Sequence, residues 1–227
     1  HGNLGLALCA QEEDRFDDAH HHWQLALEWA ERSKNDASVA LALNSLGEMA
    51  RHRNDWDQAE RYYERALHLA KELGSEFRMA LALHNLGYVA LHRGEPGTAR
   101  RHFTESLSLY ADRQYRKGKA ECLAGLGKVE VSAGRPERAA KLCGASEAIL
   151  EQLGAQLDTL DRAAYERTLE TLRNRLGGRL DFLLDEGRAM SIDEAVTYAA
   201  DRRAMNSKAR RASERKRDAS SSPVPPA

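Results

Sequence analysis

The sequence of 227 residues has few cysteines and no long apolar segment. Its three cysteines, Cys9, Cys122 and Cys143, are odd in number and far apart, so they indicate neither a disulfide framework nor a zinc site, and we expect a reducing compartment. No stretch approaches the roughly 18–20 consecutive apolar residues of a membrane span, and the start lacks the pattern of a signal peptide. The sequence therefore predicts a cytoplasmic protein that does not bind a membrane.

Proline is also scarce, and most of it lies at the end of the chain. Only Pro96 and Pro136 occur before residue 223, whereas Ala, Leu, Glu and Arg dominate the sequence between. Those residues favour helices, and no segment shows the alternation of β-branched and polar residues that a strand needs. Hydrophobic residues make up 42% of the chain, which is enough for a folded core of one or two domains. The sequence predicts an all-α fold.

The chain matches itself when it is displaced by 40 residues. A Leu-Gly pair, a turn residue, an alanine and a large or apolar side chain recur at this period: Leu46-Gly47, Leu86-Gly87 and Leu126-Gly127; Asn54, Gly94 and Gly134; Ala59, Ala99 and Ala139; Tyr63, Phe103 and Cys143. Each unit predicts two helices joined by a tight turn, because Asn or Gly can end the first helix and Pro can begin the second.

The recurring glycines within the predicted helices need a physical reason. Glycine in a helix interior costs about 0.5–1 kcal/mol relative to alanine. We expect Gly47, Gly87 and Gly127 to let the two helices of a unit approach closely, with the recurring alanines as the facing residues. Large side chains, among them Tyr63 and Phe103, together with Trp56, would then fill the groove between successive pairs.

This pattern of Leu-Gly, alanine after twelve residues, an aromatic after sixteen and Ala or Ser after nineteen resembles the tetratricopeptide repeat (TPR). The resemblance implies a right-handed α-solenoid of helix hairpins that binds partners on its concave face. The usual unit has about 34 residues, and units of 40 are similar to those of large bacterial regulators of the maltose-regulon activator type. Segments such as Tyr165-Glu166-Arg167 and Glu186-Gly187-Arg188 resemble the end of the TPR region in ATP-binding and LuxR-type transcriptional regulators. The sequence has neither a phosphate-binding loop nor a helix-turn-helix and begins with His, so we expect a C-terminal fragment of such a regulator.

Three parts of the chain are predicted. Residues 1–154 would form four TPR-like repeats, the first truncated, residues 155–205 would form C-terminal capping helices, and residues 206–227 a basic, Ser/Pro-rich disordered tail or linker. Within the first unit, a turn two residues longer than in the other units, at Glu12 to Arg15, is preferred over the strict 40-residue register. The predicted helices lie near residues 1–12, 16–33, 37–53, 56–73, 77–93, 96–112, 116–133, 136–153, 160–176, 179–188 and 192–205.

The sequence offers few candidates for catalytic or metal-binding residues. His20, His21 and His22 would point about 100° apart on a helix, so they cannot converge on one metal ion. No Ser-His-Asp or Cys-His set can be argued from the spacing, and we expect no enzyme, no cofactor and no metal. Residues 201–227 hold eight Lys or Arg against three acids but no aromatic residue. A solvated linker is the first interpretation of this tail, and a weak contact with nucleic acid is the alternative.

The candidate site is therefore the inner surface of the predicted array. Residues of the first helices that would face inward mix charge, imidazole and aromatic surface, which suits a protein or peptide partner. They are Asn44, Glu48, Arg51, His52, Leu81, His84, Tyr88, His92 and Lys128. Two hypotheses remain open: an interaction and signal-sensing module of a multidomain bacterial regulator, which docks a partner, an inducer or other domains of the parent protein, or a structural spacer or oligomerisation arm without a ligand.

Overall fold

The computed structural model describes residues 16–110 and 115–201, and every element in these ranges is a helix. The helices are α2 (Phe16–Arg32), α3 (Asp36–His52), α4 (Trp56–Glu72), α5 (Glu76–His92), α6 (Pro96–Leu109), α7 (Arg116–Ser132), α8 (Pro136–Leu153), α9 (Thr159–Leu176), α10 (Arg179–Arg188) and α11 (Ile192–Ala200). The all-α prediction is confirmed. The expected helix at 1–12, the first-unit turn, Cys9 and the basic tail lie outside the described residues.

The turns within the hairpins have the backbone that the sequence predicts. Asn54 and Gly94 have φ values of 60° and 74°, in the left-handed region that ends a helix. Pro96 then occupies the first turn of α6, where its missing N–H is not needed. In the preceding hairpin Asp55 caps α4, because its side chain accepts a hydrogen bond of 3.0 Å from the backbone N–H of Gln58. Gly134 and Pro136 repeat the arrangement between α7 and α8.

The recurring glycines make room for the side chain sixteen residues later. A Cβ atom added to Gly87 would lie 2.7 Å from the ring of Phe103, and one added to Gly127 would lie 2.8 Å from the sulfur of Cys143. The nearest contacts of Gly47 and Gly87 are thus the rings of Tyr63 and Phe103 rather than the recurring alanines, whereas Gly127 lies against the Cys143 sulfur and the backbone of Ala139, the recurring alanine of its hairpin. Phe103 also lies against Gly125 of the next hairpin, so it fills the space between successive pairs as expected.

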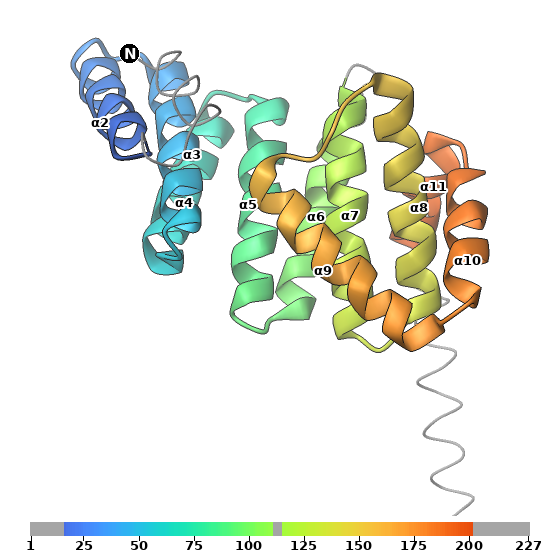
Figure 1. Ribbon diagram of the computed structural model, residues 1–227. Coiled ribbons are helices and arrows are strands. Elements are labelled where there is room, and N and C mark those ends of the chain that lie inside the picture. The colour runs from blue at the N-terminus through green and yellow to red at the C-terminus, as the bar shows by residue number, and fades with distance from the viewer. Residues whose placement is uncertain (1–15, 111–114, 202–227) are drawn as a thin grey trace, which may run out of the picture.

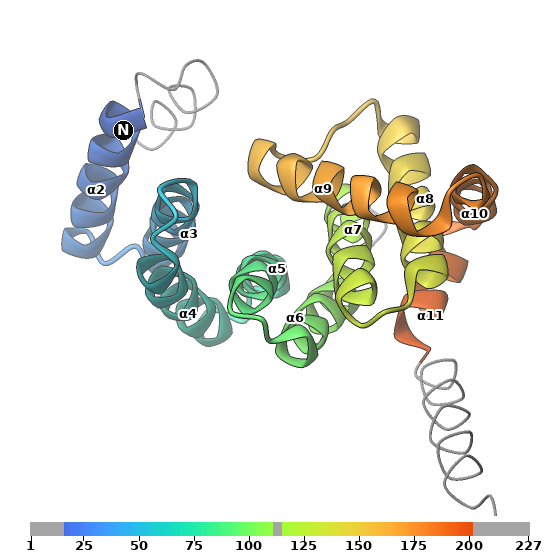
Figure 2. The same ribbon diagram turned by 60° about the horizontal axis from the view of Figure 1, so that its bottom comes forward.

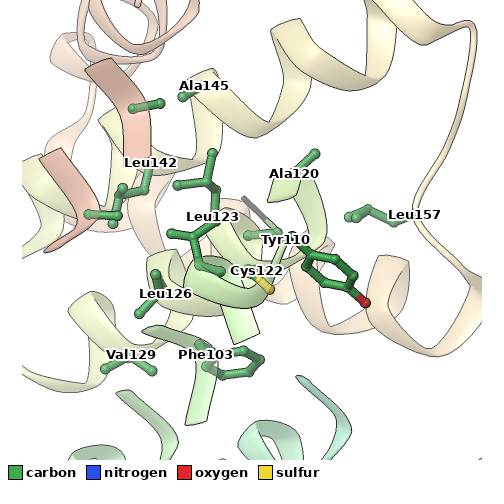
Figure 3. Close-up of a cluster of buried hydrophobic side chains, with 14 of the residues drawn as sticks. Phe103, Tyr110, Ala120, Cys122, Leu123, Leu126, Val129, Leu142, Ala145 and Leu157 are labelled. Carbon is green, nitrogen blue, oxygen red and sulfur yellow. The ribbon is translucent and has the colours of Figure 1, made fainter. Parts of the chain in front are cut away.

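The hairpins α3–α4, α5–α6 and α7–α8 stack in chain order into a curved array (Figures 1 and 2). Each hairpin buries apolar residues against the next, and Trp56 at the start of α4 stacks on His92 at the end of α5, with ring centroids 4.1 Å apart. The largest apolar cluster spans α5 to α8, extends to Ala164 of α9 and Ala195 of α11, and includes Phe103, Leu123 and Leu126 (Figure 3). This arrangement is a TPR-like α-solenoid.

The helices after the third hairpin leave the regular stack. α10 packs closely on α8, because Gly144 and Gly187 each lie against the backbone of the other helix. α9 does not continue the stack, and it crosses the inner side of the curve instead (Figure 2). Leu172 of α9 and Leu183 of α10 join the apolar cluster on α8, whereas Phe182 of α10 is 67% exposed.

α11 ends at Ala200 rather than near residue 205 as expected. The backbone of Asp201 is extended, and the guanidinium of Arg138 donates hydrogen bonds to the carbonyls of Tyr198, Ala199 and Asp201. A side chain of α8 thereby satisfies carbonyl groups that the end of α11 leaves open. At the other end of α11, Ser191 and Glu194 form a capping box. Within the described part of the chain, no helix is both long and apolar enough to cross a bilayer.

Candidate polar site on the inner face

A carboxylate from α9 lies at the centre of the inner face. Asp161 is in the first turn of α9 and is 5% exposed. Its Oδ1 lies 2.7 Å from Nη2 of Arg51 on α3, and its Oδ2 lies 2.8 Å from Nε2 of His84 on α5. One acid thus bridges the first helices of two successive hairpins, over a sequence separation of 110 residues to Arg51.

A chain of amides holds Arg51 in place. Nη1 of Arg51 donates to Oδ1 of Asn85 at 2.9 Å, and the amide of Asn85 donates to Oδ1 of Asn44 at 3.0 Å. The amide of Asn44 in turn donates to Glu48 at 2.8 Å. All of these side chains come from α3 or α5. The hydrogen bonds between them therefore fix the orientation of the guanidinium without any contribution from α9. We refer to Asn44, Glu48, Arg51, His84, Asn85 and Asp161 as the inner-face network.

Aromatic rings form one wall of this network. The guanidinium carbon of Arg51 lies 4.7 Å from the centroid of the Tyr88 ring, in a cation–π contact. His84 meets the rings of Tyr88 and Phe103 edge-on, at centroid distances of 5.2 and 5.6 Å. Nδ1 of His84 lies 3.8 Å from the sulfur of Cys122 on α7. Apolar rings around the charges exclude water, which strengthens the attraction between them.

The electrostatics follow from burial and from the ion pairs. Burial alone would raise the pKa of Asp161, but Arg51 and His84 outweigh it and hold this pKa well below its usual range. Burial would lower the pKa of His84, yet the hydrogen bond to Asp161 raises it well above 6.5. For Glu48, burial dominates and raises the pKa to about 7, although Arg51 lowers it in part. Near neutral pH the network therefore holds the Arg51 cation, the Asp161 carboxylate and a partly protonated Glu48, and the raised pKa of His84 favours its protonated form.

The predicted site residues divide into three groups. Asn44, Arg51, His84 and Tyr88 are buried; Glu48, Leu81 and Lys128 are half-buried; His52 and His92 are exposed. His84, which the sequence predicts to face inward, is buried and bonded to Asp161 of α9. His92 belongs to the stacking contact with Trp56 and lies outside the network. Lys128 lies near α9. Burial and the positive charges of Arg167 on α9 and Arg51 on α3 lower its pKa.

Sequence reasoning missed Asp161, although a signal for it exists. The buried positions in and just before α9 are Leu157, Asp161, Ala164, Thr168 and Leu172. Their spacing of three or four residues marks one face of a helix. An acid in such a stripe is rarely buried without a partner, so Asp161 points to a cation elsewhere in the chain. Asn85 was also missed, because it follows His84 and carries no periodic signal of its own.

The arrangement is suited to bind a carboxylate. Arg51 and His84 present N–H donors from two helices, and the amide network and the rings fix their directions. Among the residues that the structure describes, no group of three or more His, Cys, Asp or Glu could hold a metal ion. The inner face thus holds an acidic side chain presented by α9.

Comparison with known proteins agrees with the architecture. A family model described as the tetratricopeptide repeat matches residues 2–72 and 78–152. A search of curated proteins finds no match. The matched ranges cover more than half of the chain and include α3 to α8, the hairpins that build the inner face. The chain therefore belongs to the tetratricopeptide repeat family.

Proposed function

We propose that this chain is a non-catalytic protein-interaction module that docks a segment of a protein partner on its concave face. Tetratricopeptide repeats generally mediate contacts between proteins, and a solenoid offers an extended inner surface for them. The observation that carries the proposal is the contact between α9 and the first helices. Side chains of α3 and α5 already hold a helix across this surface through Arg51, His84 and Asp161.

The proposal extends to the context in which docking occurs. We propose a cytoplasmic bacterial regulator as the parent protein, with the repeats acting as its signal-sensing part. Contacts within a solenoid join only neighbouring units, so a small change of angle between hairpins accumulates along the array. A partner or inducer that bridges α3, α5 and α7 would change these angles and so reach distant domains.

A peptide selection tests the docking face. Peptides displayed on phage are selected against the whole chain, and their affinity is then measured for the variants Leu81→Glu and Glu64→Lys. Leu81 is a half-buried residue on α5, one turn before His84, whereas Glu64 is exposed on α4. We expect Leu81→Glu to weaken binding at least tenfold and Glu64→Lys to leave it unchanged.

The alternative function makes the opposite prediction. If no selected peptide depends on Leu81 and the chain associates with itself in a concentration-dependent manner, it is a structural arm and the docking proposal fails. Circular dichroism of both variants shows whether the helices remain folded.

A further inference from the structure

The two halves of α9 are held by unlike contacts. The C-terminal half is anchored by apolar packing, since Leu172 is fully buried in the cluster formed with α8 and α10. The first turn is held by the Asp161 ion pairs and by the buried Leu157 just before the helix, whereas Ala164 and Tyr165 pack into the main apolar cluster and the Tyr165 hydroxyl donates to Glu147 at 2.7 Å. Asp158, the residue that precedes α9, makes no side-chain capping bond to the helix and pairs instead with Lys117 at 2.7 Å. The part of α9 before Ala164 can therefore leave the inner face while the rest of the helix stays packed.

We propose that the first half of α9 is an internal substitute for the partner. The segment that docks on the concave face is then an amphipathic helix with a carboxylate in its first turns, and it displaces residues 159–163 by taking the place of Asp161. This inference rests on the proposed docking function and specifies the chemistry of the partner. In this structure the inner face already binds a helix of its own chain, in the position that we propose for the partner helix.

The network requires an acid from whatever occupies it. Arg51 and His84 have side chains only 4% exposed, and removal of one member of a buried ion pair leaves the other charge without compensation. Two other acids have partners of their own, since Glu48 within the network accepts from Asn44, and Glu121 beside it pairs with Lys117 at 3.3 Å. A helix without a carboxylate would therefore bind much more weakly than one that carries it.

The contact between Asp161 and Arg51 leaves one N–H donor of the guanidinium unused. A partner helix with an acidic residue can therefore compete with α9. Asp161 contacts only Nη2 of Arg51, and the buried Nε of Arg51 has no hydrogen-bond partner among the described residues. A guanidinium binds a carboxylate best through two parallel hydrogen bonds. A glutamate on a partner helix reaches one methylene further than Asp161 and can use both Nε and Nη2. The partner can thus bind more tightly than the helix it replaces.

A peptide with the sequence of residues 157–176 tests the inference. The fluorescently labelled peptide is titrated into the whole wild-type chain and into whole chains that carry Asp161→Ala or the milder Asp161→Asn. We expect the peptide to bind both variants at least tenfold more tightly than the wild type, because their own α9 no longer occupies the network. A second peptide, in which Asp161 is replaced by Asn, should bind the variants at least tenfold more weakly than the first. Glu170→Ala, at an exposed position of α9, is the matched control and should bind the peptide like the wild type.

Several results would overturn the inference. If the wild type and the Asp161 variants bind the peptide with equal affinity, α9 does not compete with the peptide. If the two peptides bind with equal affinity, the inner face does not recognise the carboxylate. Absence of binding, with α9 still protected from proteolysis in Asp161→Asn, would make α9 a permanent cap. Dimers of the variants that take up no peptide would indicate exchange of α9 between two copies. Peptides that depend on Leu81 but leave α9 in place would overturn this inference alone and leave the proposed function standing.

Discussion

The seams within the hairpins and the inner face are built on opposite principles. At the seams, a glycine on one helix and a large side chain on the next meet sixteen residues apart, and the same contact recurs in successive units, as at Gly47 with Tyr63 and Gly87 with Phe103. On the inner face, no two units are alike, and the contacts join Arg51 and His84 to a helix outside the repeats. The seams depend on shape and the inner face on charge.

This difference shows where the fold is encoded and where the binding specificity lies. Packing at the seams is insensitive to charge but leaves no room for a methyl group, so repetition of the small residue is sufficient to build the array. The inner face tolerates different side chains in each unit because solvent or a ligand can satisfy them. In this chain α9 satisfies them, which turns a surface into a buried polar core. Substitutions in the two regions should therefore lower stability for different reasons, steric overlap at the seams and unpaired buried charge on the inner face.

The largest effect is expected from Arg51→Met. This change removes the cation and leaves the Asp161 carboxylate buried beside His84 alone, so we expect a loss of about 3–5 kcal/mol in the free energy of unfolding. Chemical denaturation followed by circular dichroism measures it. The exposed pair of Arg65 and Glu31, at 2.5 Å, gives the matched control, and Arg65→Met should change stability by less than about 1 kcal/mol. Similar losses for the two variants would contradict the comparison.

A smaller effect is expected at the seam. Gly87→Ala places a methyl group 2.7 Å from the ring of Phe103, which is completely buried and cannot move away, so we expect a loss of about 1–3 kcal/mol. Gly97→Ala on α6 is the control, because nothing lies within 4 Å of the added atom and alanine favours a helix. The control should be neutral or stabilised by up to about 1 kcal/mol. Stabilisation of both variants, measured by denaturation at one pH, would show that the seam is not tightly packed.

The smallest effect depends on pH and belongs to the inner face. Because burial raises the pKa of Glu48 from 4.5 to about 7, the folded chain retains a proton there that the unfolded chain releases. Ionisation of Glu48 thus lowers the free energy of unfolding as the pH rises from about 4.5 to 7. Above that range this loss of stability no longer grows. Since Gln keeps the acceptor for Asn44 without the charge, Glu48→Gln should be more stable than the wild type by about 1–2 kcal/mol at pH 8 and nearly equal to it at pH 4.5.

Denaturation of the wild type and the variant at both pH values checks this difference. Glu64→Gln at an exposed position of α4 should change stability by less than about 0.5 kcal/mol at both. A Glu48→Gln variant that is equally stable at both pH values, relative to the wild type, would show that Glu48 is solvated.

The seams and the turns could be predicted from the sequence because their signal is local and repeated. Gly94 followed by Pro96 marks the same turn wherever it occurs, and the helix bounds of α3 to α8 follow from it. The inward positions of Arg51, His84 and Tyr88 could also be predicted by analogy between units. Their burial could not, because it depends on α9, whose path after Gly154 has no counterpart in the repeats. The contact of Asp161 was missed because its partner Arg51 lies 110 residues away.

The central claim is that the inner face holds an acidic residue of α9 through side chains from separate hairpins. An NMR titration of the His84 imidazole in the whole chain tests it most directly, in the wild type and in Asp161→Asn. Because the hydrogen bond to Asp161 raises the pKa of His84, the pair stabilises the fold fully below pH 6.5, and this contribution is lost as the pH rises through the folded value. We expect the wild-type pKa to lie well above 6.5 and to fall below 6.5 in the variant. A wild-type value at or below 6.5, or the same value in both proteins, would contradict the claim.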